Sequence, residues 1–245
     1  MTERRVAVVS GGSRGLGQGI CADLLAAGWT VATFSRSSTP FVDQQRAADP
    51  EGKQFHWAGV DGTDFDGLKR FANDVLDRYE RIDVLVNNMG VGTDGLLAMA
   101  RDADVHRQIS LNLEAAVLLT RACVKGMLAE RSGSVINISS VNALRGHSGV
   151  AVYSATKAAL IGLTKSLAVE LGPAGIRVNC VAPGYFESEM TGGLTDEQRA
   201  RIVRRTPLRR LGEVADMVGV IRFLISPAAS FVTGQVLAVD GGLTS

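Results

Sequence analysis

The sequence predicts an α/β fold in which one doubly wound, seven-stranded parallel sheet lies between two layers of helices. Short apolar runs alternate with longer amphipathic stretches along the whole chain, which is typical of strands joined by crossover helices. The apolar runs are nearly continuous rather than alternating, as expected when helices cover both faces of a sheet. No linker-like or repetitive segment divides the 245 residues. We therefore expect a single domain, residues 1–245, folded as a three-layer α/β/α sandwich.

The predicted elements follow from these patterns in chain order. Seven short runs rich in β-branched residues are predicted strands: Val6–Ser10, Thr30–Ser35, Gln54–Val60, Val84–Asn87, Ser134–Ile138, Val178–Ala182 and Val236–Val239. Five longer stretches have the apolar spacing of amphipathic helices: Gln18–Ala27, Phe65–Tyr79, Ala103–Glu130, Val152–Leu171 and Val214–Leu224. The longest irregular stretch, Pro40–Gly52, is predicted to be a surface loop.

Composition and charge exclude several classes of protein. Apolar residues make up 46% of the chain and charged residues 21%, which fits a large buried core and excludes a mainly disordered chain. The net charge of +1 gives no reason to expect nucleic acid or a membrane as partner. The three cysteines are far apart and form no C-x-x-C pair, so we predict neither a disulfide framework nor a metal site. With no targeting signal and no apolar stretch near the ~18 residues of a membrane span, we expect a cytoplasmic protein.

A glycine-rich loop follows the first predicted strand, where the helical pattern begins. Its residues are Gly11, Gly12, Ser13, Arg14, Gly15, Leu16 and Gly17. Such a turn lets a pyrophosphate approach the main-chain N–H groups at a helix N-terminus. The spacing G-x-x-x-G-x-G differs from G-x-G-x-x-G, so a plain tight turn is the alternative. The position directly after the first strand favours a nucleotide site.

The end of the second strand indicates which nicotinamide dinucleotide binds. An NAD site offers a carboxylate here to the ribose 2′-hydroxyl, but this chain reads Ser35-Arg36-Ser37. A guanidinium suits the charge and acceptor geometry of a 2′-phosphate. Arg36, helped by Arg14, therefore predicts NADP(H) rather than NAD(H). The alternative is that both arginines are ordinary solvated surface residues.

The strongest chemical signal is Tyr153, four residues before Lys157 in a helical pattern. Residues at this spacing share one face of a helix, and a nearby ammonium lowers the pKa of a phenol. A tyrosine tuned in this way transfers a proton to or from the oxygen of a carbonyl or an alcohol. Because the spacing also arises by chance, it needs support from other motifs.

That support comes from an ordered set of motifs. The glycine loop is followed by Asn87-Asn88-Met89-Gly90, Asn112, Ser140, the Tyr153 and Lys157 pair, Pro183-Gly184 and Val239-Asp240-Gly241-Gly242. In order and spacing, this set resembles the short-chain dehydrogenase/reductase family over essentially the whole chain. The resemblance implies a Rossmann-like sheet, usually in a homotetramer, that binds NAD(P)(H) at the carboxyl ends of the strands.

The resemblance also implies roles for individual residues. Tyr153 is the expected general acid/base and Ser140 the donor that polarises the substrate carbonyl, so both bind one substrate oxygen. Lys157 is expected to bind the nicotinamide ribose and to lower the pKa of Tyr153, and Asn112 to hold a water that relays protons. The hydride comes from the cofactor. The other implied cofactor contacts are Asp61 and Gly62 beside the adenine, Asn88 and Gly90 beside the adenosine ribose, and Pro183, Gly184 and Phe186 beside the nicotinamide.

Some of these positions have structural alternatives, and two depart from the family pattern. Ser140 alone is also consistent with a strand end, Asn112 with a bond inside its helix, and Asp61 with a helix cap. Met89 replaces the small alanine usual in Asn-Asn-Ala-Gly, which places a flexible side chain beside the expected adenosine site. Ser10 replaces the common threonine before the glycine loop and keeps the hydroxyl.

Further likeness predicts the substrate class. The segments Val135–Ser140, Ala182–Thr191 and Pro207–Gly212 are most similar to 3-oxoacyl-acyl-carrier-protein reductases, with acetoacetyl-CoA reductases as close relatives. We therefore expect NADPH-dependent reduction of a 3-oxoacyl thioester of acyl-carrier protein or CoA, with a substrate loop at residues 185–210. One alternative is an alcohol or polyol dehydrogenase, or a ketoreductase of specialised metabolism, acting on a non-thioester ketone. Another is a non-catalytic NAD(P)-binding sensor or scaffold.

Surface residues bear on the partners. Arg131 matches a basic position that carrier-protein reductases use for docking, but Ala174 stands where a second basic residue is common. The segment Arg199–Arg210 holds six arginines, which indicates either an anion contact or a solvated helix face. Ala103–Glu130 and Val152–Leu171 have more apolar positions than one sheet face needs, which favours helix pairing between subunits.

Overall fold

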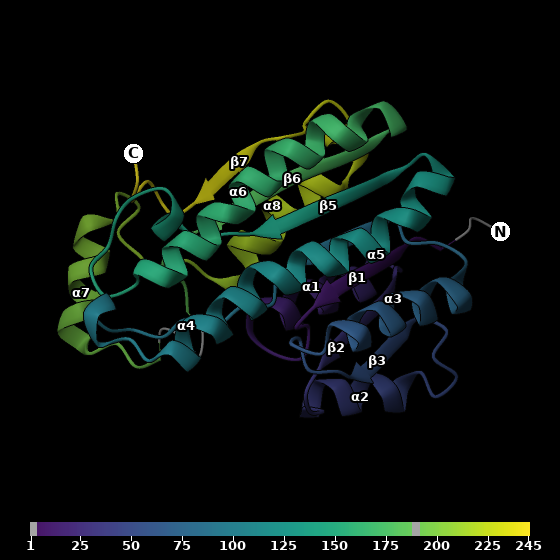
Figure 1. The fold of residues 1–245 in the computed structure, drawn as a ribbon, viewed down its shortest axis with the longest axis horizontal. Coiled ribbons are helices and arrows are strands. Elements are labelled where there is room, and N and C mark those ends of the chain that lie inside the picture. The colour runs from purple at the N-terminus through teal and green to yellow at the C-terminus, as the bar shows by residue number, and fades with distance from the viewer. Residues whose placement is uncertain (1–3, 188–191) are drawn as a thin grey trace.

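The computed structural model describes residues 4–187 and 192–245, so the last four residues of the segment Ala182–Thr191 lie outside the described part. Seven strands form one sheet in the order β3-β2-β1-β4-β5-β6-β7 (Figure 1). All neighbouring strands in this sheet are parallel, so the predicted parallel sheet is confirmed. The strands are β1 (Val6–Ser10), β2 (Thr30–Ser35), β3 (Phe55–Gly59), β4 (Val84–Asn87), β5 (Gly133–Ile138), β6 (Ile176–Pro183) and β7 (Val236–Val239).

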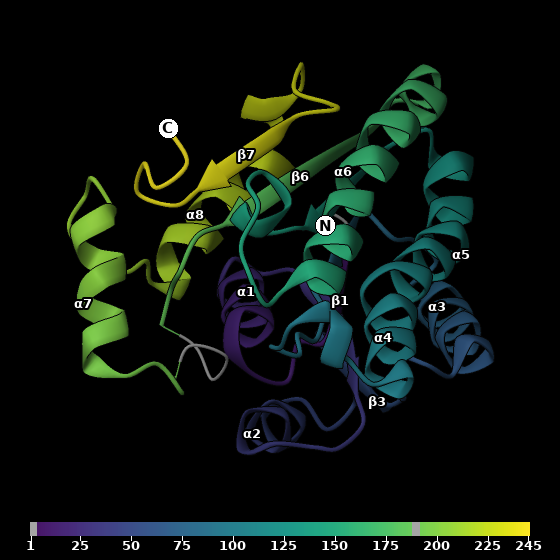
Figure 2. The same cartoon turned by 60° about the vertical axis from the view of Figure 1, so that its left-hand side comes forward.

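Helices cover both faces of the sheet, as Figures 1 and 2 show. On one face lie α3 (Phe65–Tyr79), α5 (Ala115–Glu130) and α6 (Ala151–Leu171), and on the other α1 (Gly15–Ala26) and α8 (Val214–Ile225). The strand order reverses at β1, which makes this a Rossmann-like sandwich. The other helices are α2 (Pro40–Ala48), α4 (Asp102–Ile109) and α7 (Asp196–Arg205), with short 3-10 turns at Leu97–Met99, Val141–Ala143, Gly172–Ala174 and Pro227–Ala229.

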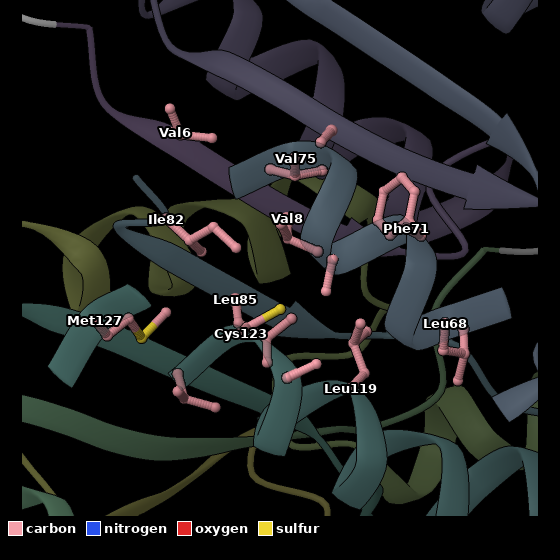
Figure 3. Close-up of a cluster of buried hydrophobic side chains, with 14 of the residues drawn as sticks. Val6, Val8, Leu68, Phe71, Val75, Ile82, Leu85, Leu119, Cys123 and Met127 are labelled. Carbon is pink, nitrogen blue, oxygen red and sulfur yellow. The ribbon is translucent and has the colours of Figure 1, made fainter. Parts of the chain in front are cut away.

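Two apolar clusters hold the layers together, one on each face of the sheet. Side chains of β1 alternate between them, because Val6 and Val8 join the first cluster whereas Ala7 and Val9 join the second. Figure 3 shows the first cluster, to which α3 contributes Phe71 and α5 contributes Leu119. Full burial of a side chain of this size stabilises the fold by about 1.5–3 kcal/mol. The clusters therefore fix the helices at a set height above the sheet.

The predicted surface loop at Pro40–Gly52 is wrong, because its first part forms helix α2. Thr39 caps the helix by accepting a hydrogen bond from the Val42 main-chain nitrogen at 3.4 Å, and Pro40 suits the first helical turn. Val42 is the one residue of the helix that is fully buried. The apolar pattern was therefore too weak to indicate a helix. Similarly, the second half of the expected substrate loop forms α7, which begins with a capping box at Thr195 and Gln198.

The stretch predicted as one long helix, Ala103–Glu130, is helical throughout but not uniform. Between α4 and α5 lies a π-helical turn, Ser110–Glu114. Such turns insert an extra residue into the helical repeat and are frequent at functional sites. This one contains Asn112, whose side chain is fully buried. The insertion therefore changes the direction in which the α4 side chains point relative to those of α5.

A chain of buried polar side chains ties these layers together below the edge of the sheet. The Asn87 amide nitrogen of β4 donates to Thr120 Oγ1 of α5 and to Asn137 Oδ1 of β5, both at 2.8 Å. Asn137 in turn donates to Thr164 Oγ1 of α6 at 2.8 Å. All four residues are buried, and hydrogen bonds between buried side chains in a low-dielectric interior help to specify one relative placement of the elements that carry them.

We predict that Asn137→Ala lowers the free energy of unfolding by about 2–3 kcal/mol, because it removes the acceptor of one buried Asn87 amide N–H and the donor to buried Thr164 Oγ1. Urea unfolding followed by circular dichroism measures this change. The matched control is Asn73→Ala on the exposed face of α3, which should stay within about 0.5 kcal/mol of the wild type. Equal effects of the two substitutions would contradict the role given to the network.

Candidate active site

The predicted site residues come together at one edge of the sheet. Because all strands run in the same direction, the segments that follow β1, β2, β4, β5 and β6 leave from the same edge. These segments carry the glycine loop, Arg36, Asn88, Ser140 and Gly184. The helix α6, which begins at Ala151, brings Tyr153 and Lys157 to the same place.

Lys157 is the electrostatic centre of this edge. Its side chain is 3% exposed, and its ammonium donates to the carbonyl oxygen of Ile138, the last residue of β5, at 2.9 Å. Burial disfavours the charged form and lowers the pKa of Lys157 from 10.5 to about 8. The ammonium is close to Gly90, where a Cβ atom would lie 3.0 Å from Nζ. Glycine at position 90 therefore leaves space for the Lys157 head group.

Tyr153 lies one helical turn before Lys157 and is partly exposed. The Lys157 ammonium is 5.8 Å from the centre of the Tyr153 ring, and the Ser140 side chain lies close enough to the Tyr153 hydroxyl to affect its pKa. Burial raises the pKa of Tyr153 above its ordinary value of 10, while the Ser140 side chain opposes this shift. The pKa therefore lies above the ordinary value, not below it as the spacing to Lys157 predicts. At neutral pH the phenol is protonated and is ready to donate.

Ser140 directly follows β5 and is 8% exposed. Its hydroxyl oxygen accepts a hydrogen bond from the Asn142 main-chain nitrogen at 3.2 Å, which caps the turn Val141–Ala143. The hydroxyl therefore has both the structural role considered from the sequence and a contact with Tyr153. Two neighbouring side-chain hydroxyls at a strand end suit the binding of one carbonyl oxygen.

Asn112 is bonded outside its own helix rather than within it. Its Oδ1 accepts from the Val91 main-chain nitrogen at 2.7 Å, and its Nδ2 donates to the Val91 carbonyl oxygen at 2.8 Å. Nδ2 also donates to Thr156 Oγ1 at 3.0 Å. The side chain thus joins the segment after β4 to α6. The water-holding role implied by the family resemblance stays a prediction.

Two site residues were not found from the sequence. Thr156 links Asn112 to α6 and donates to the Tyr153 carbonyl oxygen at 2.8 Å, and Ser139 donates to the Lys157 carbonyl oxygen at 2.7 Å. Both are buried polar residues in or beside recognised motifs. Their position on the inner face of the helix and at the end of β5 was the available signal. Both hold the main chain around Tyr153 and Lys157 in place.

The glycine loop has the geometry of a phosphate cradle. Gly11 and Gly15 have φ values of 67° and 53°, which residues other than glycine rarely adopt. A Cβ atom on Gly17 would overlap the Gly11 carbonyl, and one on Gly12 would overlap Thr33, whereas the space beside Gly15 is open. Helix α1 begins at Gly15 with no side-chain cap and no acidic residue in its first turn. Its N-terminal amides therefore fit a pyrophosphate.

The other loop residues support this turn from beneath. Gly12 donates from its main-chain nitrogen to Thr33 Oγ1 at 2.9 Å, and the Ser13 carbonyl accepts from Thr39 Oγ1 at 2.9 Å. Leu16 is buried in the second apolar cluster, and Arg14 is exposed at the helix N-cap. The loop is therefore held to β2 and to the core while its outer side faces solvent.

Ser10 and Asn88 join the glycine loop to the end of β4. The Ser10 hydroxyl oxygen accepts from the main-chain nitrogens of Asn88 and Met89, both at 3.0 Å. The Asn88 amide nitrogen donates to the carbonyl oxygens of Ser10 at 3.0 Å and Gly11 at 3.3 Å. Asn88 therefore acts as a brace between two loops. Its placement beside an adenosine ribose stays a prediction.

Arg36 and Asp61 lie near each other at the ends of β2 and β3. Both are exposed. Hydrogen bonds from Thr63 are the largest cause of the lowered pKa of Asp61, and the charge of Arg36 contributes to it. Asp61 does not cap α3, as one structural alternative holds, because Asp64 does so by accepting from the Gly67 nitrogen at 2.9 Å. The side chains of Asp61 and Arg36 are therefore accessible to a ligand at this end of the site.

On the other side of the site, Gly184 and Phe186 follow β6. The Gly184 nitrogen donates to the Val239 carbonyl at 3.0 Å, and a Cβ atom on Gly184 would lie 2.7 Å from that of Asp240. Phe186 forms a bridge with Gly212. The motif after β7 therefore packs against the motif after β6, with Pro183 buried at the strand end.

The basic surface residues have partners of their own. Arg131, at the end of α5, donates to the Pro173 carbonyl at 2.9 Å. In the arginine-rich segment, Arg199 pairs with Glu187 and Arg210 with Asp216 at 2.6 Å. Arg201, Arg204 and Arg205 are exposed on α7. The segment is therefore partly a charged helix face and partly a network of ion pairs.

The described residues, 4–187 and 192–245, hold neither a metal-binding cluster nor a membrane-spanning helix. They contain no cluster of three or more His, Cys, Asp or Glu side chains suited to a metal ion. Within the same residues, no helix has the length and apolar character needed to cross a membrane.

Comparisons with known proteins agree with this arrangement. A family model described as enoyl-(acyl carrier protein) reductase matches residues 11–244. The 3-oxoacyl-[acyl-carrier-protein] reductase of Synechocystis is 39% identical over 241 residues, which are 98% of this chain and 96% of the relative. The reductase of the same name from Vibrio harveyi is 35% identical over 241 residues, 98% of each chain.

Solved structures show the same fold. A gluconate 5-dehydrogenase from Burkholderia cenocepacia, in complex with NADP and tartrate, superposes with a TM-score of 0.92 at 33% identity and covers 98% of this chain and 95% of its own. ElxO with NADP bound superposes with a TM-score of 0.89 at 30% identity and covers 98% of each chain. The chain therefore belongs to the short-chain dehydrogenase/reductase family of nicotinamide-dependent oxidoreductases, which act on CH–OH and C=O groups.

Proposed function

We propose that the protein reduces a 3-oxoacyl thioester to the 3-hydroxyacyl thioester with NADPH. The observation that carries this proposal is the hydroxyl pair of Tyr153 and Ser140 beside the buried ammonium of Lys157. This constellation lies on the sheet edge where the glycine loop opens. Relatives named as 3-oxoacyl-[acyl-carrier-protein] reductases match almost the whole chain, which supports a thioester substrate.

The side chains divide the chemistry of reduction between them. Tyr153, protonated at neutral pH, donates its proton to the substrate oxygen as negative charge develops there. Ser140 donates a hydrogen bond to the same oxygen and so stabilises that charge. Lys157 holds a positive charge close to the phenol and favours the phenolate that remains after proton transfer. When bound, NADPH supplies the hydride.

We propose NADPH as the cofactor, with the glycine loop and the N-terminus of α1 on the pyrophosphate. Arg36, with Arg14, faces the 2′-phosphate, and Asp61 and Gly62 lie beside the adenine. Asn88 and Gly90 line the adenosine-ribose side. Lys157 bonds the nicotinamide ribose, and Pro183, Gly184 and Phe186 flank the nicotinamide. The uncapped start of α1 and the open space beside Gly15 support this placement, as do the two neighbours solved with NADP.

Exposed apolar side chains favour an acyl substrate over a polyol. The segments that follow β4, β5 and α7 carry five large apolar residues that are 43–80% exposed: Leu96, Leu97, Met99, Leu144 and Leu208. A Cβ atom on Gly92, in the first of these segments, would lie 3.4 Å from the Tyr153 ring. Exposed apolar side chains of this kind suit the hydrocarbon part of an acyl thioester. A polyol dehydrogenase is the second candidate, because a gluconate 5-dehydrogenase is a close structural neighbour.

We also propose that the protein is a homotetramer. Apolar side chains on the outer faces of α5 and α6 support subunit pairing, because Val117, Leu128 and Val169 are exposed there and Val169 is 80% exposed. Phe231, just before β7, is fully exposed. Large apolar residues that are exposed on neighbouring elements often mark protein–protein contacts.

The proposed reaction is tested by following NADPH oxidation with acetoacetyl-carrier-protein, acetoacetyl-CoA, and a panel of simple and polyhydroxylated ketones. We expect the thioesters to react fastest. The Tyr153→Phe variant should lose at least ~100-fold in kcat with any accepted substrate, because it removes the proton donor, while NADPH still binds. Activity with ketones but not thioesters would contradict the substrate class, and an active Tyr153→Phe variant would contradict the catalytic assignment.

We predict that kcat/KM for reduction is constant from pH 6 to about pH 7 and falls above pH 8. The pKa of Lys157 is lowered to about 8, so its ammonium is charged below this pH and becomes neutral above it. Tyr153, with its pKa raised, stays protonated over this range. A pH profile of initial rates measures the change, which should approach tenfold per pH unit for loss of one proton. A flat profile up to pH 10 would mean that the charge on Lys157 is not required.

We predict that Arg36→Asp lowers the ratio of kcat/KM with NADPH to that with NADH by about tenfold or more, because it replaces a phosphate partner with a like charge. Steady-state kinetics with both cofactors measures this ratio. The matched control is Arg46→Asp on α2, an exposed arginine that makes the same change in net charge and should leave the ratio unchanged. An unchanged ratio in Arg36→Asp would exclude Arg36 from the phosphate site.

A further inference from the structure

Met89 and Gly62 come from different segments and occupy one space. A Cβ atom on Gly62 would overlap the Sδ and Cε atoms of Met89 and would lie 2.8 Å from Leu111 Cδ2. Gly62 is buried directly after Asp61, and Met89 follows Asn88 at the end of β4. The thioether therefore packs over the bare backbone of Gly62. In this arrangement, a long side chain at position 89 and any side chain at position 62 would occupy the same space, so they cannot both be present without a shift.

The main chain of Met89 has little freedom to relieve such a clash. Its nitrogen donates to the Ser10 hydroxyl at 3.0 Å, and its Cα and Cβ atoms lie 3.4 Å from the position a Gly11 Cβ would take. Gly11 has a φ of 67°. Met89 is thus wedged between the glycine loop and the segment after β3. Only the torsions of its flexible side chain can change.

The inner side of this wedge is closed. Met89 packs against the first apolar cluster. A hollow too narrow for a water molecule separates it from the helix that carries Leu111 and Asn112. The outer side is the edge with Asp61 and Asn88, of which Asp61 is exposed. If the thioether is displaced from Gly62, it therefore moves outwards, because the closely packed interior has no room.

We propose that Met89 and Gly62 are a size-matched pair that sets the adenosine-side wall of the cofactor site. The inference rests on the proposed NADPH function, in which Asp61, Gly62 and Asn88 line that side. A side chain at position 62 pushes Met89 into the space for the adenosine half of the cofactor. A small residue at position 89 removes the overlap with the thioether and leaves only the close approach to Leu111 Cδ2, the end of a flexible side chain. The pair thus determines affinity for the adenosine half without contacting the reacting atoms, which lie at Tyr153 and Ser140.

The test is a double-mutant cycle of Gly62→Val, Met89→Ala and the variant with both changes. The first readout is binding of 2′,5′-ADP, which carries the adenosine half and its 2′-phosphate, by calorimetry. We expect Gly62→Val to weaken binding about tenfold and the double variant to recover most of this loss. The second readout is kinetic: the KM for NADPH should rise in Gly62→Val while kcat at saturating NADPH stays within twofold.

Two further proteins separate this role from a general loss of stability. Gly219→Val places the same side chain on the exposed surface of α8, with no atom within 4 Å of the new Cβ, and should leave 2′,5′-ADP binding unchanged. Met89→Leu keeps the bulk of the side chain, so combined with Gly62→Val it should not restore binding. If Gly62→Val does not fold, a folded, ligand-binding double variant still supports the pair.

The outcomes distinguish this inference from the function on which it rests. If the wild type does not bind 2′,5′-ADP, the NADPH proposal fails and this inference fails with it. If the wild type binds but Gly62→Val binds equally well, the cofactor proposal stands and the paired wall is wrong. If Gly62→Val is impaired and Met89→Ala does not restore it, the two positions act independently and the proposed pairing is overturned.

Discussion

Parallel pairing of β1 with both β2 and β4 is the constraint on which the site depends. Because the strand order reverses at β1, the loops that leave β1 and β4 diverge to opposite faces and open a crevice between them. The Ser10 hydroxyl and the Asn88 amide close the lower part of this crevice with four hydrogen bonds. These bonds join the end of β1 and the glycine loop to the segment that follows β4. The sheet itself does not connect these segments beyond the ends of the strands. The glycine loop therefore has a fixed position relative to the segment that faces Lys157.

Burial has opposite effects on the two ionisable groups at the centre of the site. It lowers the pKa of Lys157 to about 8 and raises the pKa of Tyr153, because a low-dielectric surrounding favours the neutral form of each. The bond from the ammonium to the Ile138 carbonyl offsets part of the cost of burying a charge. At pH 7 the lysine is still charged and the phenol still holds its proton. That combination suits a site that donates a proton to a carbonyl oxygen and then stabilises the phenolate left behind.

The sequence predicted the sheet well because each strand is buried on both faces and therefore nearly all apolar. The prediction was weaker where burial is slight, as in α2, which buries little beyond Val42. The π-helical turn around Asn112 was not visible, because one extra residue barely alters the apolar period of a long helix. Motif spacing located the side chains of Tyr153, Lys157 and Ser140. It gave no access to partners that act through main-chain atoms, such as Val91 and Ile138, because any residue type supplies those atoms. It also did not predict that burial raises the pKa of the tyrosine above its ordinary value.

Met89 shows why a departure from a family motif is hard to interpret from one position. Alone, a long side chain in place of alanine beside the adenosine site suggests an obstruction. The structure places that side chain over Gly62, a position with no side chain to displace, so the bulk is accommodated within the wall rather than in the cofactor space. The two residues are in contact although they are distant in the sequence, and effects of substitutions at such positions are not additive. In the proposed cofactor site, affinity on this side is therefore a property of the pair, and a substitution at either position acts through the space that the other one leaves.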